Sequence, residues 1–178
     1  MRSVLCCAAV ALVGLALAGC SSQTSETTFY DPDYPLYADA SELCAAADVV
    51  VIGHALSDDV REVDLADAGP AVTVMTVTQF EVTDVVAGTA LHPGDVIEVG
   101  QAGGHFEGND YLADQYELSG GDDHLLFLAL YPATPAALVS PAQGGYAVTG
   151  SAEFEPSELN PTPGMLRDVP RDQLCAAG

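Results

Sequence analysis

A continuous apolar run at residues 49–52 and a second run at 124–131, apolar after His124, dominate the hydrophobic pattern of the chain. A short apolar run bounded by turn signals is typical of a β-strand buried on both faces. Gly120-Gly121-Asp122-Asp123 supplies such a turn signal before the second run. Both runs are therefore predicted to be strands of the hydrophobic core.

Residues 72–86 follow a different pattern, in which apolar and polar positions alternate. Val74 and Phe80 share one face of an extended chain, and Gln79 and Glu81 share the other, as a half-buried strand requires. Strands usually have five or six residues, so we expect this longer one to bend near residues 76–78.

Weaker signals divide the rest of the chain. Asp39 is predicted to cap a helix of about two turns, with Glu42 three residues later as in a capping box. A turn at residues 93–95 precedes a short strand at 96–99, and residues 137–149 are typical of a hairpin. Polar composition predicts a loop or hairpin end at 57–70 and a long loop or lid at 105–121.

Five uneven strands, one of them long and bent, and one short N-terminal helix predict a mainly β fold. A small antiparallel OB-like barrel is the first expectation, and a two-sheet sandwich is the alternative, because the pattern does not determine whether the edge strands pair. The length beyond the first 36 residues suits one domain, at 37–178.

The first twenty residues have the pattern of a bacterial lipoprotein signal. Arg2 precedes an apolar run that is shorter than the roughly 20 residues of a membrane-spanning helix, and the run ends at Leu17-Ala18-Gly19-Cys20. We expect cleavage after residue 19, lipidation of Cys20, and a flexible Ser/Thr-rich acidic tether at 20–36. This predicts a domain attached to the extracytoplasmic face of the cell membrane through Cys20.

Charge is the most unusual feature of the composition. The segment after residue 19 contains all 26 acidic residues, three arginines and no lysine, which gives a formal charge of −23. Such a charge repels phosphates, so nucleic acid and anionic lipid surfaces are excluded as partners, whereas cations and basic proteins are compatible. A genome bias or a salty habitat would explain the same composition without any ligand.

Cys44 and Cys175 are the cysteines that remain once the signal and Cys20 are set aside. An even pair in an oxidising compartment predicts a disulfide, and no Cys-x-x-Cys spacing indicates a metal site.

Motifs of catalysis are missing from the sequence, which has no Gly-x-Ser-x-Gly elbow, His-Glu-x-x-His helix or phosphate-binding loop. We therefore expect a non-catalytic binding or interaction module without a cofactor, with Tyr111 and Tyr116 in a candidate loop for an envelope protein partner. A hydrolytic enzyme is a less favoured alternative. A second alternative is a Ca²⁺-binding envelope protein, because carboxylates are frequent near this loop. Its candidate ligands are His105, Glu107, Asn109, Asp110, Asp114, Glu117, Asp122 and Asp123.

Several strand and turn motifs resemble a family of exported Gram-positive proteins of the actinobacterial type. The motifs are 47–53, 80–88, Pro93-Gly94-Asp95, Gly103-Gly104, 125–128 and Gln143-Gly144-Gly145-Tyr146. Members of this family are often lipid-anchored, have a small OB-like β-barrel domain and largely lack an assigned function. The resemblance implies the same fold and attachment for residues 44–150, and it implies no activity.

Overall fold

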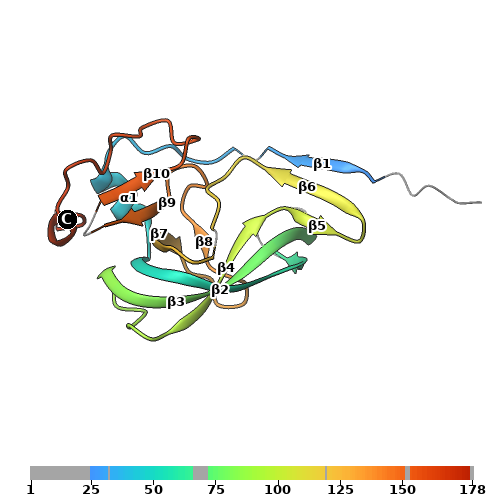
Figure 1. The fold of residues 1–178 in the computed structure, drawn as a ribbon, viewed down its shortest axis with the longest axis horizontal. Helices are drawn as coiled ribbons and strands as arrows, with labels where there is room; N and C mark the ends of the chain where they lie inside the picture. The colour runs from blue at the N-terminus through green and yellow to red at the C-terminus, as the bar shows by residue number, and fades with distance from the viewer. Residues whose placement is uncertain (1–24, 32, 66–71, 119, 151–152, 177–178) are drawn as a thin grey trace, which may run out of the picture.

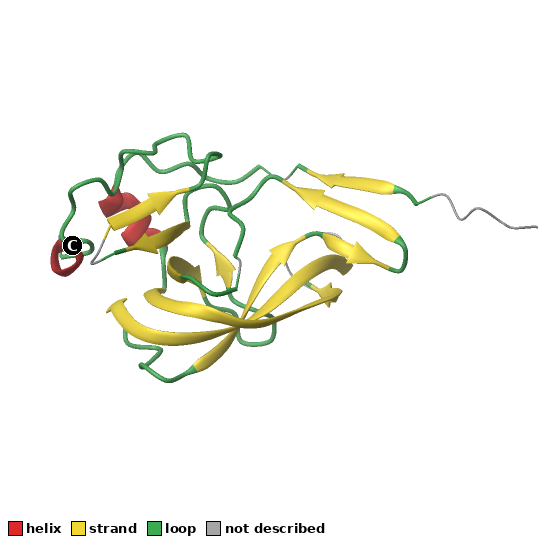
Figure 2. Cartoon of the chain, in the orientation of Figure 1, coloured by secondary structure: helices red, strands yellow, loops and turns green. Residues whose placement is uncertain are grey.

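A computed structural model describes residues 25–31, 33–65, 72–118, 120–150 and 153–176. Over these residues the fold is mainly β, with one α-helix, and the strands form two sheets (Figures 1 and 2). The predicted signal peptide at 1–19 and Cys20 lie outside the described residues.

The larger sheet has seven strands, in the order β10-β9-β7-β2-β3-β4, with β8 also paired to β7. Its strands are β2 (Val49–Asp64), β3 (Val72–Ala87), β4 (Val96–Ala102), β7 (Asp123–Ala129), β8 (Ala137–Leu138), β9 (Gly145–Thr149) and β10 (Glu153–Pro156). The smaller sheet has the order β1-β6-β5, from β1 (Thr27–Tyr30), β5 (Gly104–Phe106) and β6 (Asn109–Ala113).

Both apolar runs form buried strands, as predicted, and each contributes to two hydrophobic clusters, although β7 ends at Ala129 and Tyr131 beyond it is exposed. In β2, Val49 and Val51 join one cluster, while Val50 and Ile52 join the other. The adjacent strand β7 alternates in the same way, since Leu126 packs with the first cluster and Phe127 with the second. Successive side chains of a strand point to opposite faces, so a strand with core on both sides has no polar positions.

The helix α1 (Ala40–Ala46) covers one face of this sheet and has the predicted cap. The Glu42 N–H donates to Asp39 Oδ1 at 3.0 Å, and the Ala38 N–H donates to Glu42 Oε2 at 2.9 Å. Leu43 packs into the second cluster beside Leu166 and Leu174 of the C-terminal tail, which ends in a short 3-10 helix (Arg171–Gln173).

A disulfide joins Cys44 of α1 to Cys175, as the sequence predicts, with Cα atoms 5.7 Å apart. It links positions 131 residues apart and holds the C-terminal tail against the helix.

Residues 57–64, in the segment predicted to be a loop or hairpin end, are the end of the β2–β3 hairpin and not a loop, because β2 continues to Asp64. The Cα register with β3 extends from Val50 to Asp64. Polar side chains at 57–59 are exposed while their backbone pairs with β3, so polarity indicated solvent on these side chains and not a loop. Shifts of register lie between 50 and 57, whereas residues 76–78, where we expected a bend, pair regularly.

Closure of the strands is the part of the fold prediction that is not confirmed. Val99 of β4 and Ala136 form an isolated parallel bridge, and β8, which begins at the next residue, pairs antiparallel with β7. Among the described residues no continuous ladder joins β4 to β7, so the strands do not close into a barrel. The two-sheet arrangement agrees with the alternative, a sandwich.

Candidate functional site

The smaller sheet lies at one end of the molecule, away from α1, β9, β10 and the C-terminus (Figure 1). Strands β5 and β6 form a hairpin within the segment 105–121 that the sequence predicts as a loop or lid, so that prediction is wrong for residues 105–113. Its two turn residues, Glu107 and Gly108, have positive φ values of 49° and 84°, which suit a tight hairpin turn. Gly108 is the sequence signal for this turn, but a Glu-Gly pair predicts a hairpin turn less strongly than Asn-Gly or Asp-Gly does.

Glycine allows the hairpin to approach β2 and β3 closely. A Cβ atom at Gly104 would lie 2.7–2.9 Å from side-chain atoms of Val60 and Thr76, and its φ of 129° also favours glycine. The Thr76 hydroxyl donates to the Gly103 carbonyl at 2.9 Å and ties the base of the hairpin to β3. A hollow of about 290 Å³ remains beside this contact. It is lined by Thr76, residues 102–105, residues 110–113, Gln115 and Glu117.

The first strand of the described residues, β1, begins at Thr27, within the segment for which the sequence predicts a flexible tether. Strand β1 runs parallel to β6, with Thr28 opposite Tyr111 and Phe29 opposite Leu112. The rings of Tyr30 and Tyr111 stack with centroids 6.0 Å apart, and the Val74 N–H of β3 donates to the Tyr30 hydroxyl at 3.3 Å. These contacts hold β1 on the domain.

Opposite faces of the smaller sheet have opposite environments. Gly104 and Tyr111 are register partners on the inner face, against the end of the β2–β3 ribbon. Phe29 and Leu112 are partners on the outer face, where their exposed fractions are 74 % and 45 %. We call these two side chains and the edge strand that carries Phe29 the outer patch. It is an exposed apolar surface at the edge of the smaller sheet.

Charge surrounds the outer patch. Asp110 is the register partner of Thr27 on the same face, and its carboxylate lies 2.7 Å from His105 Nδ1 across the hairpin. Glu26 and Asp31 flank β1 in the sequence and are exposed. The patch is therefore apolar at its centre and acidic at its rim.

Tyr116, the second tyrosine of the predicted partner loop, is not at this surface. It is buried among Val99, Leu126 and other core residues, with its hydroxyl 2.5 Å from His124 Nδ1. Burial raises the pKa of the Tyr116 hydroxyl, and the nearby Asp122 carboxylate raises it further. The prediction that Tyr116 meets a partner is thus wrong, because the chain after β6 turns its ring into the core.

The acidic run does not gather into a metal site. Within the described ranges, no group of three or more His, Cys, Asp or Glu side chains has the geometry to hold a metal ion. In the hairpin, Asp110 pairs with His105, while Asp123 lies 3.7 Å from His54. Strand alternation and the intervening core separate residues that are close in the sequence.

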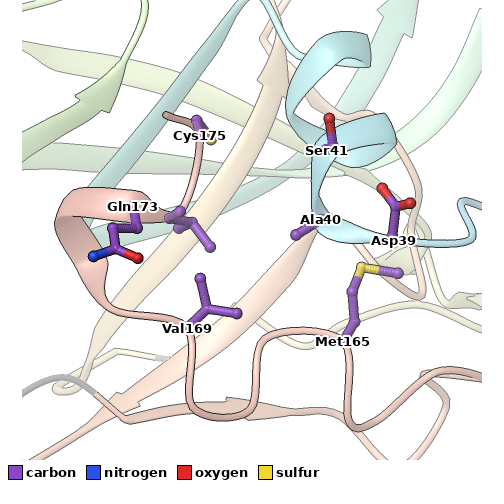
Figure 3. A pocket seen from close by; sticks show the side chains of 8 residues that line it. Asp39, Ala40, Ser41, Met165, Val169, Gln173 and Cys175 are labelled. Carbon is purple, nitrogen blue, oxygen red and sulfur yellow. The ribbon is translucent and has the colours of Figure 1, made fainter. Parts of the chain in front are cut away.

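A second hollow, of about 330 Å³, lies between α1 and the C-terminal tail (Figure 3). Met165 and Val169 of the tail point toward Ala40 at the start of the helix, near Cys175 of the disulfide. The sequence analysis did not find it, because its walls come from segments more than a hundred residues apart. Its lining is largely apolar, with Asp39, Ser41 and Gln173 as the polar residues.

Comparison of the chain with models of protein families, with curated proteins and with solved structures found no match. None of the helices in the described ranges has the length and hydropathy needed to cross a membrane.

Proposed function

We propose that this chain is a lipoprotein of the extracytoplasmic membrane face, attached through Cys20, and that its domain is a non-catalytic module that binds a protein of the cell envelope through the outer patch. The exposed Phe29 beside Leu112, on a strand whose outer edge pairs with no described strand, is the observation that carries the binding part of the proposal. The Leu-Ala-Gly-Cys sequence at 17–20 supports the anchor.

A lipid on Cys20 would place the outer patch near the membrane. Cys20 precedes Thr27 by seven residues, and an extended chain of that length spans at most about 25 Å. The helix and the C-terminal tail lie at the opposite end of the molecule (Figure 1). A partner would accordingly be a protein that is itself close to the bilayer.

The anchor is tested by cell fractionation of Cys20→Ala, with Ser21→Ala as the matched control beside it. Without the thiol there is no site for the diacylglyceryl group, and the protein should move from the membrane fraction to the medium. Ser21→Ala should stay in the membrane. Retention of Cys20→Ala in the membrane would refute the lipoprotein assignment.

Binding is tested by proximity labelling from a fusion to the protein on intact cells. The variant Phe29→Ser/Leu112→Ser removes the apolar centre of the patch, and Val96→Ser removes a side chain that is 50 % exposed on β4, outside the patch. We expect the patch variant to lose specific labelled proteins that the wild type and Val96→Ser both label. Identical labelling by all three proteins would overturn the assignment of the patch.

We also propose that the larger sheet is a partly open OB-like barrel. Support comes from the Ala136 N–H, which donates to the Glu98 carbonyl at 2.8 Å, and the Gly100 N–H, which donates to the Ala136 carbonyl at 2.8 Å. These bonds bring β4 beside the segment that leads into β8 on β7. Amide hydrogen exchange tests the idea, because the Gly100 and Ala136 amides should be protected like those of a sheet interior. Exchange at the rate of exposed loops would refute this partial closure of β4 against the segment before β8.

A further inference from the structure

We infer that the free edge of β1 binds an extended, lysine- or arginine-bearing segment of the partner protein as an added strand. This inference rests on the proposed function and names the class of partner for the outer patch. Addition of a strand to a sheet edge is a common mode of peptide recognition, in which backbone hydrogen bonds supply affinity and side chains supply specificity. Three features of β1 carry the argument: its backbone, its apolar side chain and its charge.

The backbone of β1 leaves one row of hydrogen-bonding groups directed away from β6. The Asp110 N–H donates to the Glu26 carbonyl at 2.9 Å, which fixes Glu26 as a residue that faces β6. Adjacent residues of a strand direct their N–H and C=O groups to opposite sides, so those of Thr27 and Phe29 face outward. In the sheet order β1 is terminal, and no described strand pairs with its outer side. Such an edge is a template for another strand.

The side chains of the patch limit what would bind there. Phe29 is 74 % exposed on the outer face, where an apolar side chain of an added strand would pack against it and Leu112. Successive side chains of an added strand point to opposite faces, so every second side chain would lie on the outer face, beside Phe29 and Leu112. The segment is thus expected to alternate apolar residues with others.

Charge selects a basic segment. Glu26, Asp31 and Asp110 surround the edge, and the whole chain has a formal net charge of −22. Two of the arginines are engaged elsewhere, since Arg61 binds Glu98 at 2.6 Å and Arg171 binds Asp84. A basic segment would be attracted and steered to this edge. A second copy of this chain would place acidic flank against acidic flank, and an anionic lipid surface would be repelled.

The probe is an alternating Lys-Val octapeptide, and an alternating Glu-Val octapeptide is its charge control. The full mature chain, released from the anchor by Cys20→Ala, is titrated with each peptide by calorimetry and by amide chemical shifts. Thr27→Pro removes an outward N–H without touching the bonds to β6, and edge strands tolerate such a proline. Thr27→Val is the matched control, because it keeps both the N–H and the β-branched shape.

We expect the Lys-Val peptide to bind the wild type and Thr27→Val, to shift the Thr27 and Phe29 amides, and to bind Thr27→Pro about tenfold more weakly. Affinity should fall as salt rises, and the Glu-Val peptide should not bind. A Lys-Val peptide with every backbone amide N-methylated keeps its charge but has no N–H group to donate to β1 from either edge, and it should not bind. This last measurement holds even if Thr27→Pro fails to fold.

Equal binding of the Lys-Val peptide to Thr27→Pro and the wild type, or of the N-methylated peptide, would show general attraction to an acidic protein and overturn the inference. Absence of Lys-Val binding to the wild type would overturn it as well. The proposed function fails separately, when Phe29→Ser/Leu112→Ser leaves the labelling on cells unchanged. If Phe29→Ser/Leu112→Ser loses the labelling but the Lys-Val peptide does not bind the wild type, the outer patch is retained as the binding site and the added basic strand is rejected.

Discussion

Truncation of Tyr116 separates its role as a core residue from the partner contact predicted by the sequence. Its side chain is 5 % exposed, packs against Gly145 and has its hydroxyl 2.5 Å from His124 Nδ1. Replacement of a buried aromatic ring by alanine costs about 3–5 kcal/mol, because apolar contacts are lost and a cavity remains. We expect Tyr116→Ala to lower the free energy of unfolding by about 4 kcal/mol, a large fraction of the stability of an ordinary domain.

Tyr111→Ala is the matched control, because it removes the same side chain from the half-buried inner face of the hairpin. Its main loss is the stack on Tyr30, which is worth about 1 kcal/mol. Urea unfolding followed by circular dichroism measures both variants, and equal slopes confirm that the same transition is compared. Equal losses of stability in Tyr111→Ala and Tyr116→Ala would refute the assignment of Tyr116 to the core.

Three further predictions concern the core and its covalent link. Removal of the disulfide by Cys44→Ala/Cys175→Ala should lower the free energy of unfolding by about 5 kcal/mol in the chain-entropy model. Urea unfolding with and without reductant measures this loss, and an unchanged midpoint would contradict the prediction. Gly145→Ala should destabilise by about 3 kcal/mol, because the added Cβ would lie 2.3 Å from the Tyr116 ring, and unaltered thermal unfolding would disagree with this packing. Burial raises the pKa of Tyr116 and Tyr146 in the folded state. Their contribution to the free energy of unfolding is therefore complete below about pH 10 and declines as pH rises further. Tyr116→Phe and Tyr146→Phe should each make that decline less steep when unfolding is measured from pH 8 to 11.

Local patterns predicted the elements whose stability depends on nearby residues. Asp39 and Glu42 form the helix cap as expected, and the apolar run at 49–52 is a strand buried on both faces. Composition was a poorer guide where backbone pairing decides the structure. The polar residues of the second half of β2 are in a strand because β3 satisfies their backbone, and sequence polarity alone does not contain that information.

The candidate site shows the same division. Tyr111 and the hairpin around it were within the segment singled out from the sequence, although as a loop. Phe29 was overlooked, because a four-residue strand in a polar segment has no periodicity to detect, and its pairing with β6 spans more than eighty residues. Tyr116 was assigned to the surface because it is surrounded by charged residues in the sequence.

The sequence by itself determined the β-rich class, the capped helix, the two core strands and the pairing of Cys44 with Cys175, since each depends on spacing or on the number of candidates. Only the tertiary structure decided that Tyr116 and not Tyr111 is buried, and that the acidic run forms no metal cluster among the described residues. It also decided that β1 completes the smaller sheet with Phe29 on the outer face. These outcomes depend on which distant segments pair, and that is set by the summed burial and hydrogen bonding of the whole chain.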